Sequence, residues 1–142
     1  MQAAPLRIML ADDHPVILDG IRGQLMGLSD MVVVATAASF AEVLDRLTQE
    51  SSDVLVLDLG NMGGSPLRLL GRLARDYPAL KVVIFSTTID LAPELLAAGA
   101  SGYVAKEDRR GELVQAIRAV AAGAIYTSAM VTAYVERRSN RA

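Results

Sequence analysis

The sequence contains no cysteine and no tryptophan, and only 4% of its residues are aromatic. Without cysteine, the chain has no disulfide framework, no thiolate nucleophile and no zinc ribbon. So few aromatic side chains argue against the stacking surface with which proteins bind single-stranded nucleic acid. A core must therefore be built mainly from Val, Leu, Ile and Ala, and a hydrophobic content of 52% is sufficient for one.

The chain also lacks a basic surface and a long apolar run. Its 14 Lys and Arg residues stand against 16 Asp and Glu, and the net charge of −2 argues against duplex DNA binding by this chain alone. Charged residues interrupt every apolar stretch before the roughly 18 residues of a membrane span. Residues 1–10 have no signal-peptide pattern. We expect one cytoplasmic domain without membrane contact.

Short apolar runs alternate with segments of helical periodicity. The runs lie at residues 6–11, 31–37, 54–58, 81–86 and 103–105. Pro15 and the capping box Ser39-Phe40-Ala41-Glu42 mark two helix starts, and Gly99 marks a helix end. Because the runs are continuously apolar, helices should cover both faces of a parallel sheet. Five such βα units predict an α/β fold with a doubly wound, flavodoxin-like sheet of five strands in order 2-1-3-4-5.

Residues 125–142 differ from these units. Ser128 is expected to cap a further helix, in which Met130, Val131, Tyr134 and Val135 form a weak apolar stripe. The chain then ends in a basic segment that contains Arg137, Arg138 and Arg141. We expect one domain over residues 1–124, followed by a linker helix and tail over residues 125–142.

Polar residues stand at the carboxyl ends of four of the apolar runs. They are Asp12 with Asp13, Asp58, Ser86, and Lys106. Open α/β sheets bind their ligands at this edge, so these side chains should converge there. Asp58 is the natural nucleophile, because a carboxylate can attack phosphorus and form an acyl phosphate. The sequence therefore predicts a phosphoryl-transfer site.

Three carboxylates at one edge require a cation. Two unit charges 4 Å apart repel by about 4 kcal/mol at an effective dielectric of 20. A divalent cation relieves this repulsion, and Mg²⁺ (or Mn²⁺) prefers carboxylate, carbonyl and water oxygens. The backbone carbonyl of Gly60 is placed to add a ligand. Lys106 and Ser86 are expected to contact phosphoryl oxygens, where positioning and charge neutralisation supply most of the catalysis.

Each of these residues also has an ordinary interpretation. Asp12 or Asp13 alone could cap the helix that starts at Pro15, and Asp58 alone could be a turn carboxylate. Lys106 and Ser86 alone are more often solvated loop residues. Only their joint placement at strand ends favours a site. His14, the only histidine, is better interpreted as a turn residue before proline than as a proton relay.

Five segments resemble the receiver domain of two-component response regulators. They are residues 11–15, 57–59, 84–87 and 99–106, and the expected helix after Gly111. Asp12-Asp13-His14-Pro15 and residues 123–126 further resemble the NarL/FixJ (LuxR-type) subfamily. The resemblance implies a histidine kinase as the phosphoryl donor to Asp58, and Mg²⁺ held by Asp12, Asp13, Asp58 and the Gly60 carbonyl. It also implies a switch, in which Ser86 moves toward the phosphoryl group and Tyr103 turns inward.

The same resemblance implies the wider function. Such a receiver is a signalling switch, not an enzyme beyond its own phosphorylation and dephosphorylation. It forms a homodimer on activation and acts on DNA through a C-terminal helix-turn-helix domain, which this chain is too short to contain. The chain departs from the family in the loop after Asp58 and in a slightly shorter segment between Ser86 and Lys106.

Two alternatives remain open. The shortened segment is compatible with a pseudo-receiver that is controlled by a ligand or partner rather than by phosphorylation. A phosphatase with an Asp nucleophile, of the haloacid-dehalogenase type, is disfavoured because the position of its second acid is occupied by Gly60.

Overall fold

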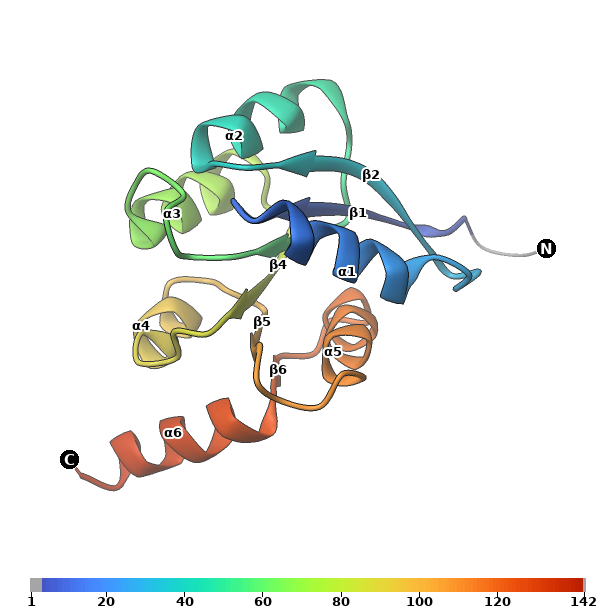
Figure 1. The fold of residues 1–142 in the computed structure, drawn as a ribbon. Helices are drawn as coiled ribbons and strands as arrows, with labels where there is room; N and C mark the ends of the chain where they lie inside the picture. Colours follow the sequence, from blue (N-terminus) through green and yellow to red (C-terminus); the bar gives the residue numbers. More distant parts are fainter. Residues whose placement is uncertain (1–3, 142) are drawn as a thin grey trace.

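The computed structural model describes residues 4–141. Residues 1–3 of the predicted domain (residues 1–124) and residue 142 of the predicted linker (residues 125–142) lie outside the described residues. Strands and helices alternate along this part of the chain (Figure 1). The strands are β1 Leu6–Ala11, β2 Met31–Ala37, β3 Val54–Leu57, β4 Lys81–Ser86, β5 Gly102–Ala105 and β6 Tyr126–Thr127. The helices are α1 Pro15–Leu25, α2 Phe40–Gln49, α3 Pro66–Asp76, α4 Ala92–Ala97, α5 Glu112–Ala121 and α6 Ala129–Ser139.

All the strands pair in parallel in the order β2-β1-β3-β4-β5-β6. The predicted doubly wound sheet and its order 2-1-3-4-5 are confirmed. The prediction of five strands missed the two-residue strand β6, which lies within the expected linker segment and pairs with β5. The Tyr126 N–H donates to the Ser101 carbonyl at 3.0 Å, which holds this short strand against the edge of the sheet.

The sheet separates two apolar cores. Residues of α1 and α5 pack on one face, and residues of α2, α3, α4 and α6 pack on the other. Figure 1 shows this division, with α1 and α5 on one side of the strands and α2, α3 and α4 on the other. Strands β3 and β5 are buried along their whole length, as the continuously apolar runs predicted.

Helix ends follow the predicted signals closely. Helix α1 begins at Pro15, and the Ser39 hydroxyl accepts the Glu42 N–H at 3.1 Å at the start of α2. Glu42 completes the capping box approximately, since its carboxylate accepts from the Ala38 N–H at 3.3 Å. Gly99 follows α4 with φ of 118°, a left-handed conformation that favours glycine.

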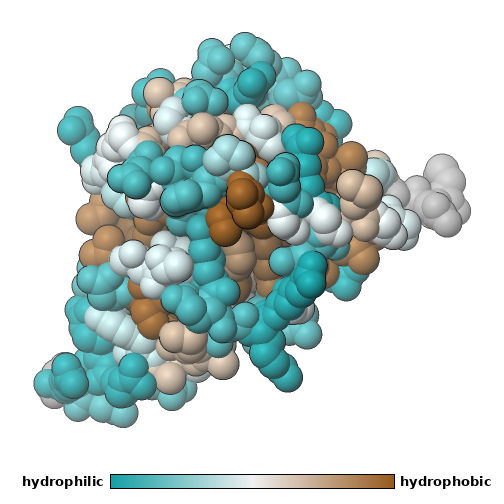
Figure 2. Space-filling model, in the orientation of Figure 1, coloured by the Kyte–Doolittle hydropathy of each residue, from teal (hydrophilic) through white to brown (hydrophobic). Residues whose placement is uncertain are grey.

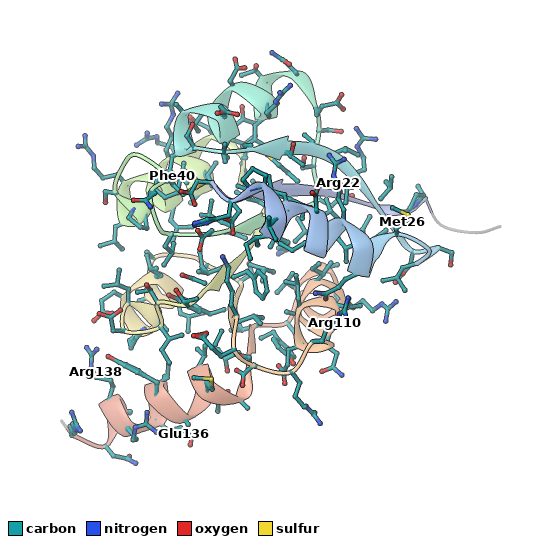
Figure 3. All side chains as sticks on the ribbon, viewed as in Figure 1. Arg22, Met26, Phe40, Arg110, Glu136 and Arg138 are labelled. Atoms are coloured by element: carbon teal, nitrogen blue, oxygen red, sulfur yellow. The ribbon has the colours of Figure 1, made fainter. Side chains whose placement is uncertain are left out.

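The C-terminal segment packs against the domain. Val131 is fully buried, and Arg138 of α6 forms an ion pair with Glu94 of α4 at 2.9 Å. In Figure 3, Arg138 lies on the side of α6 that faces α4, whereas Glu136 lies on the other side. Ser128 occupies the predicted N-cap position, but its hydroxyl makes no capping bond. It accepts the Ala105 N–H of β5 at 3.0 Å instead, because Ser128 is buried against that strand.

The molecular surface in the view of Figure 2 is predominantly hydrophilic, with apolar residues in scattered patches. No helix within residues 4–141 is long and apolar enough to span a membrane.

Candidate functional site

Two carboxylates lie side by side at the carboxyl edge of the sheet. Strand β1 leads directly into Asp12, and β3 leads into Asp58. Backbone pairing continues one residue beyond these strands, because the Asp58 N–H donates to the Ala11 carbonyl at 2.9 Å. Asp12 and Asp58 are only 1% and 5% exposed. Such burial of two charged groups requires a compensating partner.

Lys106 provides part of that compensation. Its N–H donates to the Ser86 carbonyl at 3.0 Å, which places the residue at the end of β5. The ammonium lies 2.7 Å from Asp12 Oδ2 and 3.3 Å from Asp58 Oδ1, and the side chain is 14% exposed. The predicted convergence of strand-end residues is therefore observed for Asp12, Asp58 and Lys106.

Asp13 and His14 complete a compact group with the two buried carboxylates. One ligand atom from each of Asp12, Asp13, His14 and Asp58 lies within 4.8 Å of all the others. Three carboxylates face one ammonium, so the group carries an excess of negative charge. Asp13 Oδ1 is buried and has no hydrogen-bond partner. Buried oxygens in this state are strong candidates for a cation ligand.

The structure does not support the capping interpretation of Asp12 and Asp13. The N-cap of α1 is His14, and no side chain makes a capping bond there. Asp12 instead accepts the His14 N–H at 2.9 Å, which ties the start of α1 to the acidic group. Sequence reasoning treated His14 as a turn residue; the structure confirms that placement and adds the imidazole to the acidic group.

Ser86 and Tyr103 meet at one residue, Thr88. The buried Ser86 hydroxyl accepts the Thr88 N–H at 3.1 Å, and the Tyr103 hydroxyl donates to the Thr88 carbonyl at 2.5 Å. The Tyr103 ring is fully buried, in the inward position that the resemblance associates with phosphorylation. Burial, with smaller contributions from the Asp90 and Asp58 charges, raises the pKa of Tyr103. Sequence reasoning missed Thr88, whose only signal was its position two residues after Ser86.

A cleft of about 330 Å³ opens beside Asp58. It is lined by His14, Val16, Ile17, Asp58, Gly60, Ser86, Thr87, Thr88 and Lys106. The loop after Asp58 is anchored by Met62, which is buried and whose carbonyl accepts the Phe40 N–H at 2.8 Å. Gly60 and Ser86 thus line the same cleft as Asp58 and Lys106. Tyr103 is not among the lining residues, but it bonds to Thr88, which is.

Comparison with known proteins agrees with this geometry. Residues 8–118 match the family described as the response regulator receiver domain. The chain is 36% identical over 141 residues to the nitrate/nitrite response regulator protein NarP of Escherichia coli, covering 96% of this chain and 65% of NarP. It is 33% identical over 130 residues to the oxygen regulatory protein NreC of Staphylococcus epidermidis, covering 89% of this chain and 60% of NreC. The chain thus spans less than two thirds of these relatives.

Solved structures give the same result. A LuxR-family two-component response regulator from Aurantimonas sp. SI85-9A1 has a TM-score of 0.87 and 33% identity, over 95% of this chain and 99% of that one. RcsB from Salmonella enterica serovar Typhimurium, bound to a promoter, has a TM-score of 0.86 and 25% identity, over 95% and 68%. The chain belongs to the response regulator receiver domain family, in its NarL/FixJ (LuxR-type) subfamily.

Proposed function

We propose that this receiver accepts a phosphoryl group on Asp58 from a histidine kinase. The observation that carries the proposal is the buried contact of Lys106 with both Asp12 and Asp58 at the end of the sheet. An oxygen of Asp58 attacks phosphorus, a P–O bond forms, and the P–N bond to the donor imidazole breaks. Lys106 and Ser86 stabilise the charge on the phosphoryl oxygens.

The residues of the acidic group fit Mg²⁺ (or Mn²⁺). All three carboxylates offer hard oxygen donors, the group has excess negative charge, and Asp13 Oδ1 lacks a partner. We assign Asp12, Asp13, Asp58 and the backbone carbonyl of Gly60 as the groups that hold the ion. When bound, the cation neutralises charge that accumulates on the carboxylates and the phosphoryl oxygens.

The whole protein is proposed to regulate transcription. NarP is named as a nitrate/nitrite response regulator, and RcsB has been solved on a promoter. We infer a receiver over residues 1–124 and a linker over residues 125–142. The linker leads to a helix-turn-helix output domain that binds DNA. Phosphorylation would favour a homodimer in the cytoplasm, through a population shift between two states of the receiver.

The test is phosphorylation by acetyl phosphate and Mg²⁺, followed by intact mass and size measurement. The chain should gain one phosphoryl group, and Asp58→Asn should abolish the gain. Asp19→Asn is a matched control, because Asp19 is an exposed aspartate of α1. A chain that stays unlabelled while an ordinary receiver is labelled under the same conditions contradicts the proposal.

The second candidate is a pseudo-receiver switched by a partner. It is favoured by the short α4, which spans only Ala92–Ala97 in the segment between Ser86 and Lys106. In that case Asp58→Asn would leave self-association and target binding unchanged. A phosphatase is disfavoured, because Gly60 stands where the second acid is required.

A further inference from the structure

We propose that the groove between α2 and α3 is a docking site for an acidic amphipathic helix of a partner protein. The two helices lie next to each other on one face of the sheet (Figure 1). The groove between them has a volume of about 690 Å³, about twice that of the cleft beside Asp58. Within residues 4–141, no residue lines both, so the groove is separate from the phosphoryl-transfer site.

The rim of the groove is basic. Arg68, Arg72 and Arg75 are exposed and line it from one side of α3, because residues three or four positions apart share a helix face. Among the described residues, the one carboxylate near these guanidinium groups is that of Asp76. It lies 3.5 Å from Arg72 Nε and 3.9 Å from Arg75 Nε. The rim therefore carries excess positive charge, although the whole chain has a net charge of −2.

The floor of the groove is apolar. Phe40 and Leu69 are each 5% exposed, and the half-buried Leu44 packs against the same core. Figure 3 places Phe40 between α2 and α3. Of the described residues that α2 contributes to the lining, none is acidic. An apolar floor with a cationic rim fits a ligand that combines apolar and acidic side chains.

Two glycines shape the groove. A Cβ atom at Gly64 would lie 3.1 Å from a ring carbon of Phe40, so glycine lets the loop before α3 approach this ring. Gly71 lies in the interior of α3, where glycine is less favourable than alanine. Packing does not require it, because a Cβ atom there would meet nothing within 4 Å. Its effect is to leave a gap between Arg68 and Arg75 that a side chain of the partner can occupy.

The spacing of the arginines favours a helical partner. Arg68 and Arg75 are seven residues apart, which is about 10.5 Å along a helix axis. Acidic residues at positions i, i+4 and i+7 of a second helix have the same spacing, and apolar residues beside them would face the floor. Guanidinium groups bind carboxylates through two parallel hydrogen bonds. Nucleic acid fits less well, because the Phe40 ring is too buried to stack on bases.

The test is selection of binders from a library of random 16-residue peptides, followed by calorimetry with the synthesised peptides. Enriched peptides should carry Asp or Glu three or four positions apart, with Leu, Ile or Phe between them. Arg68→Glu combined with Arg72→Glu should weaken their binding about tenfold or more. Arg22→Glu combined with Arg46→Glu is the matched control. It makes the same change in net charge at exposed arginines outside the groove, and should change binding less than about twofold.

A second variant separates shape from charge. Gly71→Leu fills the gap between the arginines without changing their charge, and should also weaken peptide binding. Circular dichroism confirms that each variant is folded. In the original protein, the peptide should shift the amide resonances of residues 64–75. A 16-nucleotide single strand of DNA should bind more weakly than the peptide.

Three results would overturn the inference. They are a selection that enriches no acidic peptides, equal losses in the two double variants, and tighter binding of DNA than of peptide. Acetyl phosphate labelling of the same variants keeps this proposal distinct from phosphotransfer. Labelling of Asp58 should persist when the groove is altered, and peptide binding should persist in Asp58→Asn.

Discussion

Single residues at the acidic edge of the sheet carry charges that oppose folding. Asp12 and Asp58 share the ammonium of Lys106, and Asp13 contributes a third carboxylate whose Oδ1 is buried without a hydrogen-bond partner. Like charges at this spacing repel, even when partial exposure screens them. The same carboxylates that would bind a cation therefore reduce the stability of the cation-free protein.

Asp13→Asn should relieve this repulsion. We expect the free energy of unfolding in EDTA to rise by about 1 kcal/mol, because one of three clustered charges is removed. Saturating Mg²⁺ should stabilise the original protein and have much less effect on the variant, since binding to the folded state alone raises stability. Urea unfolding with and without Mg²⁺ measures both effects. Equal stabilisation of the two proteins by Mg²⁺ would exclude Asp13 as a ligand.

Tyr103→Phe tests the contact with Thr88. The variant loses the hydrogen bond from the Tyr103 hydroxyl to the Thr88 carbonyl, and should lose about 1 kcal/mol of stability. Burial raises the pKa of Tyr103 above the ordinary value of 10.0, so the folded state favours the protonated phenol. The associated stability is complete below pH 10.0 and is lost as the pH rises further.

Alkaline titration followed by tyrosinate absorbance measures this effect, and no tryptophan obscures the signal. In the original protein, part of the tyrosinate absorbance should appear only as the protein unfolds. This part should be missing from Tyr103→Phe. Tyr126, whose pKa burial raises to about 12, remains as an internal reference. Retention of the late component in the variant would assign it to another tyrosine.

The site was predictable from sequence where strand ends position a side chain. Asp12, Asp58 and Lys106 follow continuously apolar runs, and parallel pairing alone brings such residues together. The contacts of His14 were not predictable, because they depend on the turn that leads into α1. The role of Thr88 was hidden for a similar reason, since both of its contacts require the path of the loop after β4.

At the scale of whole elements, α6 shows how tertiary packing determines the position of a weakly amphipathic helix. Its sequence predicted a helix in a linker, and the structure places it against α4 and β5. The short strand β6 could not be predicted, because two residues carry no periodicity and gain their pairing only from the edge of β5. Local sequence thus determines that α6 is a helix. The pairing of β6 with the edge of the sheet determines where α6 lies.

Val131→Ala should detach α6 from the domain. Val131 is 0% exposed, and its truncation removes buried methyl groups at the contact, at a cost of about 2 kcal/mol. Met130→Ala is the matched control, because Met130 is 42% exposed on the same helix and its truncation should be nearly neutral. Urea unfolding and amide exchange over residues 129–139 measure the difference. Equal effects of the two substitutions would mean that α6 packs differently in solution.

At the scale of the whole molecule, one loop connects the acidic edge to α6. Ser86 and Tyr103 both bond to Thr88 in that loop. Two residues later, the Asp90 carbonyl accepts from the Tyr134 hydroxyl of α6 at 3.2 Å. Arg138 of α6 also reaches Asp90, at 3.5 Å. If a phosphoryl group attracts the Ser86 hydroxyl away from the Thr88 N–H, the loop that contains Thr88 and Asp90 is disturbed. The contacts of Asp90 with α6 should then weaken.

Occupation of Asp58 by a phosphoryl group should consequently loosen α6. We expect beryllofluoride with Mg²⁺ to increase amide exchange over residues 129–139 in the original protein. The same addition should leave Asp58→Asn unchanged, and Ser86→Ala should reduce the response, since its side chain cannot reach a phosphoryl oxygen. Exchange measured by mass spectrometry resolves the segment. If the chain binds beryllofluoride and amide exchange in α6 stays unchanged, the short segment between Ser86 and Lys106 isolates the helix from the site. In that case α4 and its loop hold one conformation whatever occupies Asp58.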